Sequence, residues 1–250
     1  MNKQTHIFGI RAIIEAIKAK KDIDKVFLQN KLKGNLSIEL DSLLKANEIP
    51  FSYVPIEKLN RITKMNHQGA IASIAPITFA NFEEVVTQLI EIKKTPLFLI
   101  LDHLTDTRNF GAIIRTAECT GVDAIVIPNK GGAPVNAETV KTSAGGIFNI
   151  PICKTTHIKD AIYYLQASGV KVIGATEKAS SSIYDISLIE PLAIVMGSED
   201  KGISNSVLKI IDELAMLPMK GKIASLNVSV ACGVFLYEVL RQRNHSGSPS

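Results

Sequence analysis

Residues 95–128 are TPLFLILDHLTDTRNFGAIIRTAECTGVDAIVIP, and the order of apolar and polar residues in this stretch indicates the fold class. The apolar runs at 97–101 and 123–127 have the length of strands, and the residues near 110–120 between them have a helical pattern. Strands that are apolar along their whole length are buried on both faces, which is typical of parallel sheets covered by helices. Thr95 is pushed out of the helical region by Pro96, so a domain is expected to begin here.

The same alternation continues toward the C-terminus. Further strands are expected at 171–175, 192–196 and 213–217, and further helices near 137–143, 157–168, 205–211 and 229–243. We therefore predict an α/β domain over residues 96–245, in which a parallel sheet carries helices on both faces. Residues 246–250 are expected to form a disordered tail, because short polar termini are usually poorly ordered.

A smaller α/β unit is expected over residues 1–78. Four isoleucines between Ile10 and Ile17 recur at the spacing of an amphipathic helix, and Ser37 is suited to cap a second helix over 37–46. Strands are expected at 25–29, 51–54 and 70–75. Residues 79–95 are predicted to be a linker that contains a connecting helix over 81–94.

Composition indicates an ordinary globular protein of 250 residues, 46% apolar and 21% charged. No apolar run approaches the roughly 18 residues that a membrane span needs, and Lys3, Arg11 and Glu15 interrupt the region where a signal peptide would be apolar. We therefore expect a cytoplasmic protein without a membrane partner. The net charge of +4 is compatible with a polyanionic partner but does not require one.

The cysteines and histidines give no sign of a disulfide framework or a metal site. Cys119, Cys153 and Cys232 are an odd number without a CxxC pair, which favours a reducing compartment. The five histidines include no pair at the i, i+4 spacing of a helical metal site. No metal is expected.

Candidate ligand-binding loops follow three of the predicted strands. In open α/β sheets, ligands bind outside the carboxyl ends of the strands. The loops at 174–176, 196–202 and 217–229 occupy such positions and are rich in glycine and polar residues.

A nucleotide-binding motif is not complete in this sequence. Gly197 and Gly202 have the GxxxxG spacing of a P-loop, but Ile203 and Ser204 follow where Lys and Ser or Thr are required. No GxGxxG fingerprint occurs either. These absences disfavour ATP hydrolysis and NAD chemistry.

A fourth candidate is the segment 101–117, which joins a strand to a helix. If the helix begins near Asn109, its free N–H groups could receive a phosphate, and Arg115 could contact the same anion. In the alternative interpretation, Asp106 or Asn109 only caps the helix and Arg115 is a solvated charge.

Three segments in fixed order resemble the motifs of the SpoU branch of the SPOUT RNA methyltransferases. They are NFGAIIRTA at 109–117, IVMGSE at 194–199 with Gly202, and LPM at 217–219 followed by SLNVSVA at 225–231.

The N-terminal segment extends the resemblance to essentially the whole chain. With FGI at 8–10 and HQGAIA at 67–72, it is similar to the small substrate-binding domain of bacterial enzymes that methylate a guanosine ribose in 23S rRNA. That domain is related in fold to ribosomal proteins that bind bent RNA. Two positions depart from the family pattern: Thr107 and Arg108 replace Pro-His, and Arg11 replaces a histidine.

The resemblance implies transfer of a methyl group from S-adenosylmethionine (SAM) to a ribose 2′-hydroxyl, most plausibly of a guanosine in 23S rRNA. The implied catalytic residues are Asn109, Arg115, Glu199, Ser225 and Asn227. The implied cofactor contacts are Thr176, Gly197, Leu217, Met219, Ser225, Leu226 and Asn227. Core packing is the alternative role for Leu217, Met219 and Leu226.

The resemblance implies that Arg115 takes the proton from the ribose hydroxyl, and that Asn109 and Glu199 position Arg115 and the RNA phosphate. A guanidinium has a pKa above about 12, however, and is therefore a poor base. Arg115 could equally hold a phosphate and stabilise the developing alkoxide.

The resemblance also implies a deep trefoil knot and a homodimer whose active site draws on both subunits. A predicted helix over 228–243 carries an apolar stripe of Val230, Val234, Tyr237 and Leu240. Such a stripe suits a dimer face, although a core-facing helix would have the same pattern.

Several alternatives stay open. The same chemistry could act on an rRNA adenosine or a tRNA guanosine. A catalytically idle RNA-binding assembly factor would be expected to lose Arg115, Glu199 or Asn227, and all three are present. A small-molecule α/β enzyme would need a polar pocket signature that this sequence does not show. Lysines between Lys18 and Lys33 could contact RNA phosphates or form an ordinary solvated surface.

Overall fold

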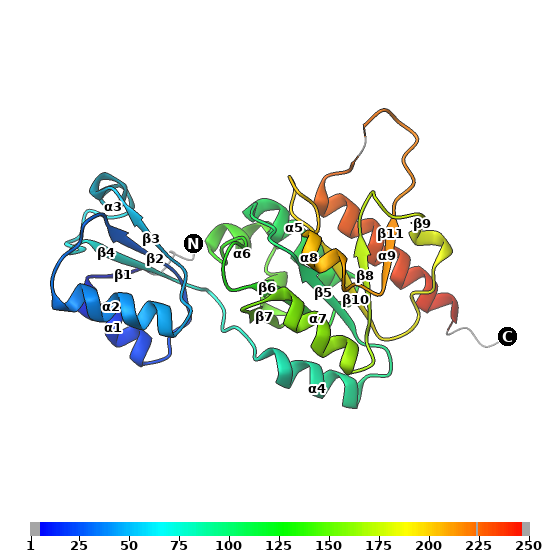
Figure 1. The fold of residues 1–250 in the computed structure, drawn as a ribbon, viewed down its shortest axis with the longest axis horizontal. Coiled ribbons are helices and arrows are strands. Elements are labelled where there is room, and N and C mark those ends of the chain that lie inside the picture. The colour runs from blue at the N-terminus through cyan, green and yellow to red at the C-terminus, as the bar shows by residue number, and fades with distance from the viewer. Residues whose placement is uncertain (1–5, 224, 247–250) are drawn as a thin grey trace. The chain divides into compact units, whose positions relative to one another are not determined.

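The structure is a computed structural model that describes residues 6–223 and 225–246 (Figure 1). The chain forms two compact units. The N-terminal unit extends to Thr78 and also contains Pro134–Ala137; the C-terminal unit contains Phe79–Ala133 and the residues from Glu138 onward.

The N-terminal unit is a four-stranded sheet in the order β1-β4-β2-β3. Its strands are β1 His6–Phe8, β2 Ile23–Gln29, β3 Phe51–Val54 and β4 Ala70–Ile74. Strand β4 runs antiparallel to β1 and β2, whereas β2 and β3 are parallel.

Helices cover both faces of this sheet. Helices α1 Ile10–Lys18 and α2 Asn35–Ala46 bury Ile13 and Leu40 in one apolar core. On the other face, α3 Ile56–Ile62 contributes Leu59 to a smaller cluster. Strand β1 and helix α3 were not expected from the sequence.

The predicted cap at Ser37 is wrong. Helix α2 begins at Asn35 with Gly34 as its N-cap. The Ser37 hydroxyl donates a hydrogen bond of 2.7 Å to the Gly34 carbonyl and therefore lies inside the first turn.

The C-terminal unit is a seven-stranded parallel sheet in the order β7-β6-β5-β10-β8-β11-β9. Its strands are β5 Leu97–Leu101, β6 Ala124–Pro128, β7 Ile152–Thr155, β8 Lys171–Ala175, β9 Ser181–Ser182, β10 Leu192–Met196 and β11 Glu213–Met216. The five residues of β5 and of β10 are all buried, as expected for strands covered on both faces. The predicted α/β class is confirmed.

Helices lie on both faces of this sheet (Figure 1). They are α4 Phe82–Ile92, α5 Thr107–Cys119, α6 Ala137–Thr142, α7 Ile158–Ala167, α8 Asn205–Leu208 and α9 Val228–Ser246, with short 3-10 turns at Gly146–Phe148 and Ile183–Asp185. Helices α4, α7 and α8 share one buried core, and α5 packs with α9. The knot implied by the family resemblance stays a prediction.

The segment 79–95, predicted as a linker, belongs to the C-terminal unit. Asn81 caps α4 by accepting a hydrogen bond of 3.0 Å from the main-chain N–H of Glu84. Phe82 and Val86 of this helix are buried in the core of the C-terminal unit. At the other end of the chain, residues 247–250 of the predicted tail lie outside the described residues, and α9 extends to Ser246.

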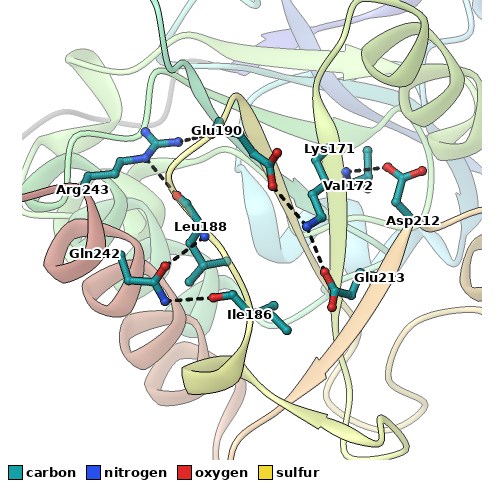
Figure 2. A network of polar contacts seen from close by, with 9 residues as sticks. All are labelled: Lys171, Val172, Ile186, Leu188, Glu190, Asp212, Glu213, Gln242 and Arg243. Carbon is teal, nitrogen blue, oxygen red and sulfur yellow. Dashed lines mark hydrogen bonds and ion pairs between the residues drawn. The ribbon is translucent and has the colours of Figure 1, made fainter. Parts of the chain in front are cut away.

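Polar contacts anchor the C-terminal end of α9 (Figure 2). The Arg243 guanidinium donates hydrogen bonds to the main-chain carbonyls of Thr95 at 2.8 Å, Leu188 at 3.2 Å and Glu190 at 2.8 Å. Gln242 adds a bond to the Ile186 carbonyl at 3.0 Å. Burial lowers the pKa of Arg243. One side chain therefore holds the helix to Thr95, two residues before β5, and to the segment before β10.

None of the helices within the described part of the chain is both long enough and apolar enough to cross a membrane.

Candidate functional site

A pocket of about 410 Å³ lies at the carboxyl ends of β10, β8 and β11, which are neighbours in the sheet. Its wall contains residues 175–178 after β8, 196–202 after β10, and both Leu217 and Met219 after β11. Residues 225–227 and three residues of α9, which are Val228, Ala231 and Phe235, complete it. The three loops predicted from the sequence thus line one cavity, at the edge where open α/β sheets bind ligands. Its volume falls within the ~300–1,000 Å³ typical of small-molecule and cofactor sites.

The loop after β10 makes a tight turn that brings Gly197 and Gly202 together. Main-chain hydrogen bonds of 3.1 and 3.0 Å join Ser198 and Gly202. A Cβ atom on Gly197 would lie only 2.0 Å from the carbonyl carbon of Gly202, so no other residue fits there without a shift of the loop. The GxxxxG spacing therefore serves a tight turn along the pocket wall.

A buried carboxylate holds this loop against β5. Asp102 is 1% exposed, and its Oδ2 accepts a hydrogen bond of 2.7 Å from the main-chain N–H of Ser204. Its Oδ1 contacts Nδ1 of His103 at 2.7 Å. Asp102 therefore ties the end of β5 to the residues that follow the pocket loop.

Three residues far apart in the sequence form a chain of hydrogen bonds at the site. The amide of Asn109 donates to Oε1 of Glu199 at 3.1 Å, and the amide of Asn227 donates to Oδ1 of Asn109 at 3.1 Å. Asn227 Oδ1 in turn accepts from the main-chain N–H of Ser229 at 2.9 Å and from its hydroxyl at 2.6 Å. Asn109 thus bridges Glu199 and Asn227, and both of these line the pocket.

Of the two capping residues that the sequence offered, Asp106 and Asn109, the structure uses Asp106. Helix α5 begins at Thr107, and Asp106 caps it by accepting a hydrogen bond of 2.7 Å from the main-chain N–H of Asn109. Glu199 Oε1 also accepts from the main-chain N–H of Asp106 at 3.3 Å. Two carboxylates therefore lie at this helix end, which favours the capping interpretation over the phosphate site. The capping alternative for Asp106 is confirmed.

Arg115 lies apart from the other predicted catalytic residues. It is exposed on α5 and is not among the residues that line the pocket. Within residues 6–223 and 225–246, its guanidinium has no hydrogen bond or ion pair. Ser225, by contrast, lies on the pocket wall with Glu199 and Asn227.

All seven residues predicted to contact a cofactor line this pocket. They are Thr176, Gly197, Leu217, Met219, Ser225, Leu226 and Asn227. Met219 is 39% exposed and Leu226 is 43% exposed, so core packing does not explain them. Leu217 is half-buried.

Several other residues of the wall were not singled out from the sequence, although Asp200 and Lys201 lie within the predicted loop 196–202. Lys178 and Lys201 bring positive charge to the pocket, and Glu177 and Asp200 bring negative charge. These four charged residues are sequence neighbours of the predicted site residues in the strand-end loops, and that proximity could have identified them. Phe235 contacts the pocket from α9, where only the tertiary structure reveals its role. Within the described residues, no group of three His, Cys, Asp or Glu side chains is placed to hold a metal ion.

Comparison with known proteins places this geometry in a family. Residues 96–237 match the SpoU rRNA Methylase family, and residues 6–80 match the family described as RNA 2'-O ribose methyltransferase substrate binding. A protein of Bacillus subtilis, YacO, assigned to the TrmH family of tRNA/rRNA methyltransferases, is 35% identical over 97% of both chains. A protein of Staphylococcus saprophyticus with the same assignment is also 35% identical, over 96% of this chain and 97% of its own.

Solved structures share the fold. The SpoU methyltransferase AviRb from Streptomyces viridochromogenes, in complex with AdoMet, has a TM-score of 0.62 and 21% identity over 96% of this chain and 90% of its own. An AdoMet-bound rRNA methyltransferase from Sinorhizobium meliloti has a TM-score of 0.62 and 24% identity over 97% of this chain and 88% of its own. With the family match and the 35% identical relatives, these findings establish that the chain belongs to the SpoU rRNA methylase family and is an RNA methyltransferase.

Proposed function

We propose that this protein uses SAM to methylate a ribose 2′-hydroxyl of RNA, with a guanosine of 23S rRNA as its target in the cytoplasm. The observation that carries the proposal is the pocket at the ends of β8, β10 and β11, with Glu199, Asn109 and Asn227 joined at its wall. The substrate-binding family that matches residues 6–80 supports the ribose as the acceptor.

The pocket wall has the chemistry that SAM requires. Met219 and Leu226 offer exposed apolar side chains against which an adenine ring can pack. Lysine and carboxylate side chains both lie on the wall, which suits a ligand that carries an ammonium and a carboxylate group. When bound, SAM supplies a methyl group on a sulfonium, an electrophile that is already activated.

Glu199 and Asn109 can position the acceptor ribose. Within the described residues, both hydrogen bonds that Glu199 accepts, from Asn109 and from Asp106, use Oε1. Oε2 has no partner among the residues that the structure describes, so it can accept a hydrogen bond from a ribose hydroxyl. Asn227 fixes the Asn109 amide and thereby orients the carboxylate. Alignment of the attacking oxygen is the main contribution that a positioned site makes to such a transfer.

The exposed face of α9 supports a homodimer. Val230 is 52% exposed and Tyr237 is 55% exposed, whereas Phe235 and Leu236 on the same helix are buried in the unit. The stripe predicted from the sequence therefore lies largely outside the core. An exposed apolar helix face beside the site favours contact with a second copy of the chain.

In this dimer, Arg115 serves the pocket of the partner subunit. Helix α5 packs with α9, so Arg115 belongs to the helix pair that would carry the dimer face. Its exposed and unpaired guanidinium can hold an RNA phosphate and stabilise the developing alkoxide.

The dimer face can be tested with matched surface substitutions. We expect Tyr237→Glu to give a monomer in sedimentation velocity and to lose most methyl transfer, because it places a charge in the apolar contact. Tyr163→Glu on α7 is the control, since Tyr163 is 53% exposed and lies on the opposite face of the sheet. If Tyr237→Glu remained as dimeric as the control, α9 would not form the interface.

RNA binding is assigned to the N-terminal unit on the basis of charge. Residues 1–78 contain twelve Lys and Arg against seven Asp and Glu, so their excess of five positive charges exceeds that of the whole chain, which is +4. Lys18 is paired with Glu39 at 3.1 Å, but Lys31 and Lys33 are exposed. Phosphate contacts by such lysines supply much of the affinity for RNA.

The reaction is tested by incubating the full chain with radiolabelled SAM and either total rRNA or total tRNA, and then mapping 2′-O-methylation. Label in a guanosine of 23S rRNA is the expected result. Label in an rRNA adenosine or in tRNA would show that this nucleotide, and not a guanosine of 23S rRNA, is the substrate. Binding of RNA without any transfer would favour the idle assembly factor. As the cellular control, a strain that lacks the gene should have no methyl group at the same nucleotide.

A further inference from the structure

A second cavity, of about 200 Å³, lies in the N-terminal unit between α2 and β3. Its wall includes Leu28 of β2 and Tyr53 of β3, which are register partners in the parallel pair β2–β3. Ile38 and Asp41 of α2 form the opposite side. The cavity is therefore at the one parallel strand pair of this sheet, near the carboxyl ends of both strands, where α/β folds commonly bind ligands.

Two large apolar side chains of this cavity are open to solvent. Ile38 is 66% exposed and Tyr53 is 52% exposed. A single exposed apolar residue needs no explanation, but a pair that lines a cavity marks a candidate ligand site. The cavity is smaller than the ~300–1,000 Å³ of sites for drug-sized ligands, so it suits one flat ring rather than a whole nucleotide.

The Tyr53 ring is held in place by a polar network. Its hydroxyl donates a hydrogen bond of 3.0 Å to Oδ1 of Asp41, and Oδ2 of Asp41 pairs with Lys45 one turn along α2. The hydrogen bond from Lys45 lowers the pKa of Asp41, and burial together with the bond to Asp41 raises the pKa of Tyr53. Tyr53 therefore keeps its proton and Asp41 stays an acceptor at neutral pH.

The network leaves polar groups available to a ligand. A carboxylate has about four acceptor sites, and Tyr53 and Lys45 occupy one on each oxygen of Asp41. The Ser42 hydroxyl, also on the cavity wall, has no partner within the described residues. These groups can accept hydrogen bonds from the N–H groups on the edge of a nucleobase.

We propose that this cavity binds one unstacked base of the substrate RNA, with the base stacked on Tyr53 and its edge against Asp41 and Ser42. Sequence-tolerant RNA recognition relies on aromatic side chains that stack single-stranded bases. Lys31 and Lys33 flank Leu32, which lines the cavity, so both can reach the phosphates next to that base. The inference rests on the proposed function and specifies how the N-terminal unit contacts the RNA substrate.

A fluorescent reporter tests the stacking directly. The chain contains no tryptophan, so Tyr53→Trp introduces a single indole at the cavity. We expect saturable quenching of its emission by a short single-stranded oligoribonucleotide of mixed sequence, because a stacked base quenches an indole. Tyr163→Trp is the matched control, since Tyr163 is 53% exposed and lies in the other unit. Equal responses of the two variants, or no response of Tyr53→Trp at RNA concentrations that saturate binding, would overturn the proposal.

Affinity measurements separate stacking from structure. Tyr53→Ala is expected to weaken binding of 23S rRNA and of the oligoribonucleotide by roughly 5- to 150-fold, the usual effect of losing one base–aromatic stack. Tyr53→Phe keeps the ring and should stay close to the wild type. SAM affinity should be unchanged in both, because the cofactor pocket lies in the other unit. Wild-type RNA affinity in Tyr53→Ala would refute the inference.

The two hypotheses fail in different ways. If the wild type binds RNA and Tyr53→Trp is quenched, but no methyl group is transferred, the proposed function fails and the base site stands. If the wild type methylates RNA and Tyr53→Ala does so with an unchanged KM, the base site fails and the proposed function stands.

Discussion

Arg115→Ala is expected to slow methyl transfer by about 10²- to 10³-fold, the usual cost of removing one group that stabilises an oxyanion. SAM affinity and the midpoint of thermal unfolding should not change, because Arg115 is exposed, lies off the pocket wall and has no partner within the described residues. Single-turnover transfer to RNA, with SAM titration by calorimetry, measures the two effects. Arg115→Lys keeps the charge but loses the planar fork of donors, so only partial recovery is expected.

Mixed dimers can show which subunit Arg115 serves. We expect Arg115→Ala and Glu199→Gln chains to be nearly inactive on their own and their equimolar mixture to recover about a quarter of the wild-type rate. In a mixed C2 dimer, one of the two sites then combines an intact Arg115 from one chain with an intact Glu199 from the other. No recovery after subunit exchange would mean that Arg115 acts within its own chain. Near-normal turnover of Arg115→Ala alone would reduce Arg115 to a surface charge.

Gly197→Ala is expected to disrupt the cofactor pocket. The added Cβ would lie 2.0 Å from the carbonyl carbon of Gly202 and 2.1 Å from the main-chain nitrogen of Ile203, so the loop must move. Overpacking of this kind costs about 1–3 kcal/mol, which corresponds to a fall in the unfolding midpoint of roughly 2–12 °C for a domain of this size. SAM affinity should fall as well, because residues 197–202 all line the pocket.

Gly221→Ala is the matched control for this loop. Among the described residues, no atom lies within 4 Å of a Cβ placed on Gly221, and its backbone does not adopt the positive φ that favours glycine. We expect its SAM affinity and unfolding midpoint to equal those of the wild type. If Gly197→Ala bound SAM as well as Gly221→Ala does, the loop after β10 would have no part in the cofactor site.

Much of the C-terminal unit can be predicted from sequence because its strands are buried. The predicted limits of β5, β8 and β10 agree with the structure to the residue, since a run of five mostly apolar residues between polar segments has few other solutions. Strand β7 was missed because Lys154 and Thr155 make up half of its four residues. Helix α3 was missed because Leu59 is its one buried residue among the seven.

The site is predictable in part for a different reason. The strand-end rule brings the loops after β8, β10 and β11 together, and it needs only the order of elements. It does not reveal that Asn109 bridges Glu199 and Asn227, because these contacts span 90 and 118 residues and depend on the order of strands in the sheet. The sequence also left the start of α5 open, since Asp106 and Asn109 are both good capping residues and only the three-dimensional structure shows which of them caps.

The position of α9 after every strand in the sequence means that the cofactor pocket is completed late in synthesis, when Arg243 can anchor the helix. Chains emerge from the ribosome N-terminus first, so β5, β8 and β10 are available before α9 has been made. Until then the carbonyls of Thr95, Leu188 and Glu190 lack their guanidinium partner, and the pocket lacks the wall that Phe235 and Asn227 supply. A nascent chain that stops before α9 therefore contains the strands of the sheet but lacks part of the wall of the cofactor pocket.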